Sequence, residues 1–194
     1  MHFLNSNDHV EIYRGRLPHW RQNRVIYFVT FRLYDSLPAA KLLSLRQERQ
    51  LWIKINPVPW SRAQRAEYNE RFNLRIQEWL DVGVGSCLLE NSELKQVMDG
   101  VPKFFDLDRY ELDEFCTMPN HVHVLVRPKS GWTLERIVHS WKSYSAKEIN
   151  RFLGRHGRLW HREYFDHIVR HEVQLESIRS YIRRNPLLWR RGVK

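Results

Sequence analysis

Two histidines separated by one residue are the first feature of this sequence that could carry chemistry. His121 and His123 flank Val122 in an apolar run that predicts a strand over residues 121–127. Since side chains alternate along a strand, both imidazoles lie on one face while Val122 and Val124 lie on the other. Two imidazoles placed in this way can hold one metal ion. The same pattern also suits two polar residues on a hydrated face, and the residues alone leave both interpretations open.

A tyrosine and an asparagine one helical turn apart form the second candidate pair. Residues 172–184 predict a last helix, which we expect to end before Pro186 because the residue preceding a proline disfavours helical geometry. Tyr181 and Asn185 share one face of this segment. Tyr181 lies at the border of the apolar stripe that includes Ile182, where its hydroxyl could reach a cleft. The alternative is a tyrosine at the edge of the core and an asparagine at a helix end.

Other tyrosines are weaker candidates for a nucleophile. Tyr144 lies three residues after Trp141 in a predicted helix over residues 133–152, and we expect it to pack on the buried stripe. Tyr164 belongs to the segment 160–169, whose pattern is ambiguous between strand and loop. Tyr181 therefore remains the preferred candidate.

The chain is strongly basic, with a formal net charge of +10, and 13% of its residues are aromatic. This balance points to a polyanion, with nucleic acid ahead of a membrane surface. Arginines interspersed with aromatic rings suit unpaired bases. His167 could contact phosphate or form a local hydrogen bond. Charge runs are often only solvated faces, but few acids follow residue 150, so we expect a nucleic-acid surface that includes Lys142, Arg158, Arg162, Arg179, Arg183 and Arg184.

The first 23 residues are polar, basic and aromatic, and they predict an irregular arm. Stacking and hydrogen bonding to unpaired bases is one interpretation of this arm, and packing of a strand flank on the sheet is the other. The base-contacting candidates are Tyr13, Arg14, Arg16, His19 and Trp20.

The order of predicted elements gives the fold class. A strand over 25–33 is followed by helices over 36–54, 62–80 and 91–99 and by a strand over 110–117. The strand, helices and ambiguous segment already described come next. This order predicts an α+β protein with a ferredoxin-like antiparallel sheet and helices packed on one face. We expect a single domain over 1–194, with residues 36–100 as an enlarged helical first crossover.

The cysteines and the hydropathy of the chain argue against several classes of protein. Cys87 and Cys116 form no CxxC pair, so neither a zinc framework nor a disulfide scaffold is indicated. No apolar run is long enough to span a membrane, and the N-terminal residues lack the apolar core of a signal peptide. A cytoplasmic protein is the expectation.

Four stretches taken together resemble the REP-associated tyrosine transposases, bacterial relatives of the single-tyrosine insertion-sequence transposases in the HUH nuclease superfamily. The likeness covers most of the chain and is weakest across residues 50–100. Leu17-Pro-His-Trp20 and Phe28-Val-Thr-Phe-Arg-Leu33 also look like the family. The stretches are Met118-Pro-Asn-His-Val-His-Val-Leu-Val126, Trp141-Lys-Ser-Tyr-Ser-Ala146, Gly157-Arg-Leu-Trp-His-Arg-Glu-Tyr-Phe-Asp-His-Ile-Val-Arg170 and Tyr181-Ile-Arg-Arg-Asn-Pro186.

The resemblance implies a fold, a site and a reaction. The sheet would be RRM-like, His121 and His123 match the HUH pair, and Tyr181 matches the catalytic tyrosine. Asn185 matches the position of a third metal ligand, which is often a glutamine in the insertion-sequence relatives. The implied reaction is cleavage and strand transfer of single-stranded DNA at REP-like hairpins through a 5′-phosphotyrosine.

The implied cofactor is Mg²⁺ or Mn²⁺, and the imidazoles favour Mn²⁺. A monomer or homodimer associated with the nucleoid is expected. A non-catalytic module that binds single-stranded nucleic acid on the same fold is the alternative function.

Overall fold

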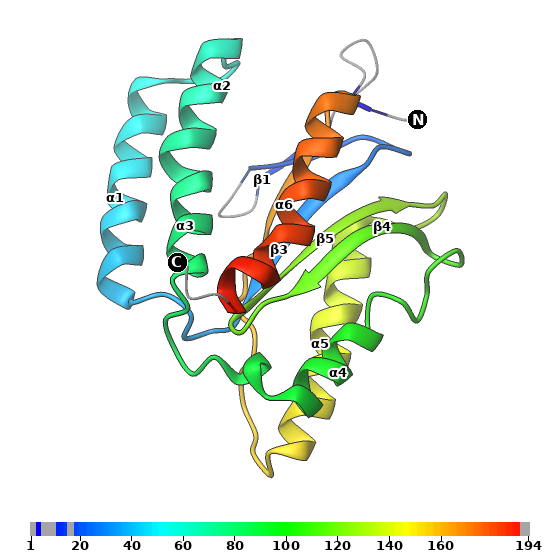
Figure 1. Ribbon diagram of the computed structural model, residues 1–194. Helices are drawn as coiled ribbons and strands as arrows, with labels where there is room; N and C mark the ends of the chain where they lie inside the picture. The colour runs from blue at the N-terminus through cyan, green and yellow to red at the C-terminus, as the bar shows by residue number, and fades with distance from the viewer. Residues whose placement is uncertain (1–2, 5–10, 15–17, 191–194) are drawn as a thin grey trace.

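The computed structural model describes residues 3–4, 11–14 and 18–190 (Figure 1). Its main sheet has four antiparallel strands in the order β4-β5-β3-β6, namely Tyr110–Thr117, His121–Pro128, Tyr27–Arg32 and Phe165–Ile168. One helical crossover joins β3 to β4, and another joins β5 to β6. This strand order with two such crossovers is the ferredoxin-like arrangement, and the predicted α+β class is confirmed.

One face of the sheet forms the larger hydrophobic core. Val122, Val124 and Val126 of β5 point to this face, where they pack with helices α4 (Ser92–Gly100) and α5 (Leu134–Phe152). Trp141 of α5 is buried there, and its indole N–H donates to Tyr110 Oη at 2.9 Å. The alternation that buries these valines turns His121 and His123 to the opposite face.

The opposite face is covered by helix α6 (Glu172–Arg190) (Figure 1). Leu175 and Ile182 of α6 are buried against Phe28 of β3 and Leu125 of β5. The prediction that the helices pack on one face of the sheet therefore holds for α4 and α5, whereas α6 packs on the other face. Both faces of β3 and β5 carry apolar side chains, so each face needs a covering layer.

Helix α6 continues through Pro186, and the prediction that it ends before this proline is wrong. Pro186 has no backbone N–H, so the helix loses one internal hydrogen bond at this turn. Trp189, one turn later, packs against the cluster beneath α6, and its ring lies on the backbone of Gly83. This packing supports the extra turn.

The first crossover contains an antiparallel helical pair beside the sheet (Figure 1). Helix α1 (Ala39–Ile55) is followed by α2 (Arg62–Tyr68), a π-helical turn (Asn69–Leu74) and α3 (Arg75–Asp81), in agreement with the predicted helices. The pair has its own core of Leu45, Trp52, Tyr68 and Phe72. A 3-10 turn, Leu88–Glu90, then leads to α4. The last residue of α3, Asp81, lies at the face of the sheet that α6 covers.

The N-terminal segment is a hairpin rather than an irregular arm. Strands β1 (Glu11–Arg14) and β2 (Pro18–Arg21) pair antiparallel. Arg21 attaches this hairpin to the body through ion pairs with Asp166 of β6 and Glu135 of α5. Ile12, Tyr13 and Trp20 are residue types that favour strands. Tyr13, Arg14, His19 and Trp20 lie on them, whereas Arg16 and the side chains of all five candidates lie outside the described residues.

Tyr144 is exposed, with 57% of its surface accessible, so the prediction that it packs on the buried stripe of α5 is wrong. The buried stripe advances from Trp141 to Ser145 and Ile149 in steps of four residues. These steps leave Tyr144 on the flank of the helix. Among the described residues, no helix is both long and apolar enough to cross a membrane.

The contact between Gly83 and Trp189 yields a stability prediction. A Cβ at Gly83 would lie 2.0 Å from the Trp189 ring, whereas a Cβ at Gly131 would meet nothing within 4 Å, and both glycines have positive φ. Gly83→Ala should therefore lower the free energy of unfolding by about 1 to 3 kcal/mol more than Gly131→Ala, because only the first adds overpacking to backbone strain. Urea unfolding of the two variants measures the difference, and equal losses would contradict this packing.

Candidate active site

The two histidines of β5 converge on one point. Their Nε2 atoms lie 2.9 Å apart, and both side chains are fully buried between the sheet and α6. Phe28 of β3 stacks on the His123 ring with a centroid distance of 5.4 Å. The alternation predicted from the sequence thus places both imidazoles in one enclosed site.

Neighbouring polar groups orient each ring. His121 Nδ1 lies 2.7 Å from Asn120 Oδ1, and Asn120 Nδ2 donates to the Val84 carbonyl at 3.0 Å, which sets the orientation of the amide. Asn120 Oδ1 can only accept, so the neutral form of His121 would carry its proton on Nδ1 and keep a lone pair on Nε2. His123 Nδ1 lies 2.8 Å from Thr30 Oγ1, which directs its Nε2 to the same point.

An acidic residue from the helical crossover completes the cluster. Asp81 Oδ1 lies 3.7 Å from His121 Nε2, and one ligand atom from each of Asp81, His121 and His123 falls within 4.8 Å of the others. Sequence analysis missed Asp81, because it stands 40 positions before His121 with no motif around it. Only the packing of α3 beside the sheet brings it into the site.

This donor set fits a divalent metal ion. Adjacent ligands around an octahedral ion with bonds of about 2.1 Å are about 3 Å apart. The separation of the two Nε2 atoms matches that spacing, and two imidazole lone pairs at 2.9 Å need a shared cation or proton between them. Two imidazoles and a carboxylate therefore form a possible His/Asp metal site.

Tyr181 of α6 reaches the same cluster. Its hydroxyl lies 3.1 Å from His123 Nε2 and 3.5 Å from Asp81 Oδ2, and its ring meets the His123 ring edge-on. Burial, followed by the charge of Asp81, raises the pKa of Tyr181 well above its usual value, while a hydrogen bond from Asn185 opposes the shift. The hydroxyl is therefore protonated at neutral pH, and any nucleophilic role requires a proton acceptor.

Asn185 lies one turn beyond Tyr181 and is buried. Its Nδ2 donates to Asp81 Oδ1 at 3.3 Å, which connects α6 to the end of α3. A hollow of about 390 Å³ opens beside these residues, and its lining includes Asp81, Tyr181, Asn185 and Arg184. We call it the tyrosine hollow. It gives the Tyr181 hydroxyl a route to a bound molecule.

The arginines of α6 have different environments. Arg179 forms an ion pair with Asp113 of β4, and Arg183 forms one with Glu114 of the same strand. Arg184 is exposed on the rim of the tyrosine hollow, and no ion pair of Arg184 is present in the described part of the chain. Arg184 is thus the α6 cation best placed to meet an anion beside Tyr181.

The remaining predicted DNA contacts lie on and after α5. Lys142 donates from Nζ to the carbonyls of His161 and Arg162 at 2.8 and 2.7 Å, and burial lowers its pKa to about 8. Arg158 and Arg162 are exposed, and Arg158 lies 5.1 Å above the Tyr34 ring. The structure therefore uses Lys142 to hold a loop, while the two arginines face outward.

His167 lies on β6 between aromatic rings rather than at the surface. Its ring contacts Phe28 and Phe165 edge-on or tilted, and its Nδ1 has no hydrogen-bond partner within the described residues. Burial, followed by the charge of nearby Arg170, lowers the pKa of His167 to about 4. The imidazole is therefore neutral at physiological pH.

Comparison with known proteins gives a consistent set of matches. The family model of IS200-like transposases matches residues 88–185, a span that includes both histidines, Tyr181 and Asn185 but excludes Asp81. An uncharacterized protein of Haemophilus influenzae is 30% identical over 122 residues, which are 50% of this chain and 64% of that protein. This chain thus spans less than two thirds of that relative.

Two solved structures are also similar. One is a REP-associated tyrosine transposase bound to a REP hairpin, with 14% identity, a TM-score of 0.45 and coverage of 91% of this chain and 73% of that chain. The other is a putative transposase from Deinococcus radiodurans, with 14% identity, a TM-score of 0.39 and coverage of 90% and 97%.

The buried imidazole of His167 yields a pH prediction. Its folded pKa of about 4 lies below the unfolded value of 6.5, so the unfolded chain binds the extra proton between these pH values. The free energy of unfolding therefore falls as pH drops from 6.5 to 4, and this imidazole accounts for about 2 to 3 kcal/mol of that fall. His167→Leu should remove that part of the acid sensitivity, and His139→Leu, at an exposed position of α5, should not. Urea unfolding at pH 7 and pH 4 measures both, and equal acid sensitivity in the two variants would contradict the burial.

Proposed function

The chain belongs to the family of IS200-like transposases, and from this premise we propose that it is a metal-dependent endonuclease and strand transferase acting on single-stranded DNA through Tyr181. The observation that carries the proposal is the position of the Tyr181 hydroxyl, 3.1 Å from His123 Nε2 and 3.5 Å from Asp81 Oδ2. These distances support the proposal because they place a candidate nucleophile next to a candidate proton acceptor and a candidate metal ligand.

In the proposed reaction, the Tyr181 oxygen attacks the scissile phosphorus. The hydroxyl proton passes to Asp81 Oδ2, which is the carboxylate oxygen nearer to Tyr181. The bond between phosphorus and the 3′ oxygen breaks, the leaving oxygen takes a proton from water, and Asp81 returns its proton to solvent. The products are a 5′-phosphotyrosine and a free 3′-OH. Because a phosphoester is retained, the reverse attack by a 3′-OH joins two strands.

We propose His121, His123 and Asp81 as the metal ligands, with Mn²⁺ favoured over Mg²⁺ by the two imidazoles. A divalent cation held by these residues supplies charge neutralisation and alignment of the scissile phosphate. Asn120 and Thr30 hold the two rings in the orientation that this requires. Asn185 is the competing third ligand. Its hydrogen bond to Asp81 supports a role in orienting that carboxylate instead.

The proposed substrate is a REP-like single-stranded hairpin. Arg184, Arg158 and Arg162 are exposed and suit phosphate contacts. Arg179 and Arg183 already pair with carboxylates of β4, so they could contact DNA only if a phosphate replaced those carboxylates. We propose that the whole chain acts as one transposase domain in the cytoplasm, as a monomer or homodimer.

Removal of the Tyr181 hydroxyl tests the nucleophile. Tyr181→Phe should abolish the covalent DNA adduct and the cleavage of single-stranded DNA in Mn²⁺, because the attacking oxygen is gone. Tyr144→Phe is the matched control at an exposed position and should behave as wild type. Denaturing gels and peptide mapping give the measurement.

Two outcomes of this experiment would count against the proposal. Near wild-type cleavage by Tyr181→Phe, or an adduct mapped to Tyr144 or Tyr164, would refute Tyr181 as nucleophile. DNA binding by wild type without any adduct would support a non-catalytic binding module instead.

A second prediction separates the two candidate third ligands. Asp81→Asn should weaken Mn²⁺ binding at least tenfold, because it removes the negative charge from the donor set. Asn185→Ala should weaken it less, because it removes only a group that orients Asp81. Isothermal titration with Mn²⁺, Mg²⁺ and Zn²⁺ measures both variants. A larger loss for Asn185→Ala than for Asp81→Asn would make Asn185 the ligand.

A further inference from the structure

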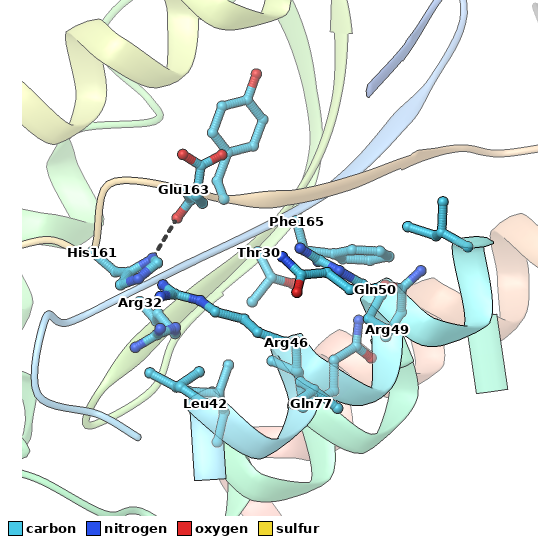
Figure 2. Close-up of a pocket in the computed structure, with 16 residues that line it drawn as sticks. Thr30, Arg32, Leu42, Arg46, Arg49, Gln50, Gln77, His161, Glu163 and Phe165 are labelled. Atoms are coloured by element: carbon cyan, nitrogen blue, oxygen red, sulfur yellow. Dashed lines mark hydrogen bonds between the residues drawn. The ribbon is translucent and has the colours of Figure 1, made fainter. Parts of the chain in front are cut away.

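A second, larger hollow lies between the helical crossover and the sheet, with a volume of about 500 Å³ (Figure 2). Helices α1 and α3 form one wall, and β3 together with residues 161–165 forms the other. We call it the arginine hollow, after Arg32, Arg46 and Arg49 in its lining. Its volume falls in the range of small-molecule sites.

The arginine hollow is rich in positive charge, because its lining has three arginines and one carboxylate, that of Glu163. Arg32 is only 7% exposed, and its guanidinium donates to the Leu33 carbonyl and to Ser36 Oγ, both neutral groups. Arg46 reaches from α1 toward Arg32 and His161 (Figure 2). Within the described residues, neither Arg32 nor Arg46 forms an ion pair with a carboxylate. A buried guanidinium without a counter-charge is costly, and a bound anion would remove that cost.

The titration of neighbouring groups agrees with this geometry. Burial, followed by the charge of Arg46, lowers the pKa of Arg32 to about 10. Burial, followed by Arg32, lowers the pKa of His161 to about 4. Like charges therefore crowd this end of the hollow.

The rest of the arginine hollow suits a nucleobase. Ile76, Leu80 and Phe165 supply apolar surface, and the side-chain amides of Gln50 and Gln77 offer both hydrogen-bond donors and acceptors (Figure 2). A cationic end, apolar walls and amides together match a nucleotide better than a simple anion.

The arginine hollow adjoins the candidate active site through two residues. Thr30 lines the hollow, and its Oγ1 lies 2.8 Å from His123 Nδ1. Leu80 lines it as well, and the next residue, Asp81, belongs to the metal-ligand cluster. The arginine hollow therefore borders the cluster of His121, His123 and Asp81.

We propose that the arginine hollow binds one nucleotide of the DNA strand next to the scissile phosphate, with its phosphate on Arg32 and Arg46 and its base near Gln50 and Gln77. This inference rests on the proposed function. Helices α1 and α3, which build one wall, lie outside the family match over residues 88–185.

The first test removes one charge from the hollow and one from elsewhere on the same helix. In a Tyr181→Phe background with chelator present, Arg46→Gln should weaken binding of a random-sequence single-stranded DNA pool about tenfold. It should also reduce the slope of the logarithm of the binding constant against the logarithm of the salt concentration by about 1. Lys54→Gln removes an exposed charge of α1 outside the hollow and should change neither. Fluorescence anisotropy gives the affinities, and thermal unfolding checks the fold. Equal effects of the two substitutions would overturn the proposal.

The second test locates the nucleotide. One hairpin enriched from the random pool is prepared as a series with a single abasic site at each position in turn. One position should weaken binding when its base is lost, and Gln77→Ala should remove that dependence at this position alone. A dependence that persists in Gln77→Ala, or that appears at no position, would overturn the proposal. Saturation by a free deoxynucleotide without displacement of the hairpin would overturn it too.

These results are independent of catalysis. Binding is measured without metal and without the tyrosine hydroxyl, so it does not depend on whether the wild-type protein forms an adduct. Absence of the adduct would refute the proposed nuclease alone, and absence of the Arg46 effect would refute the nucleotide pocket alone.

Discussion

The close approach of two buried imidazoles is the constraint on which the rest of the site depends. His121 and His123 place their Nε2 atoms 2.9 Å apart in a region closed to solvent. Two lone pairs at that distance repel unless a cation or proton lies between them, so the arrangement needs support from outside the pair. Asn120 and Thr30 provide that support by holding the Nδ1 atoms. The valines between and beyond the histidines anchor the strand in the main core.

One face of the sheet thus carries the larger core, and the other carries a smaller hydrophobic cluster together with the candidate site. On the second face, α6 brings Tyr181 and Asn185, and the end of α3 brings Asp81. Trp189 lies on Gly83 just past Asp81, so the ends of the two helices are packed together. The helical crossover consequently contributes an acidic group to the site and one wall of the arginine hollow. These contacts therefore couple the position of the helical crossover to the geometry of the candidate site.

Local patterns predicted the elements and part of the site, and tertiary packing decided the rest. Strand alternation was sufficient to place His121 and His123 together, and a spacing of four residues placed Tyr181 beside Asn185. Asp81 had no such signal, because its role depends on how α3 packs beside the sheet. Pro186 misled the prediction of the helix end, since local preference favoured a stop while the packing of Trp189 carried the helix on. Tyr144 was misplaced because steps of three and of four residues diverge along a long helix.

We propose that a carboxylate from the crossover joins the two histidines of β5 around one cation. Anomalous scattering from crystals soaked in Mn²⁺ tests it most directly, because it locates the ion relative to its ligands without reference to activity. The account predicts a single strong peak bound by His121 Nε2, His123 Nε2 and an oxygen of Asp81. A peak bound by the histidines and Asn185 with Asp81 turned away, or no peak between the histidines at saturating Mn²⁺, would contradict it.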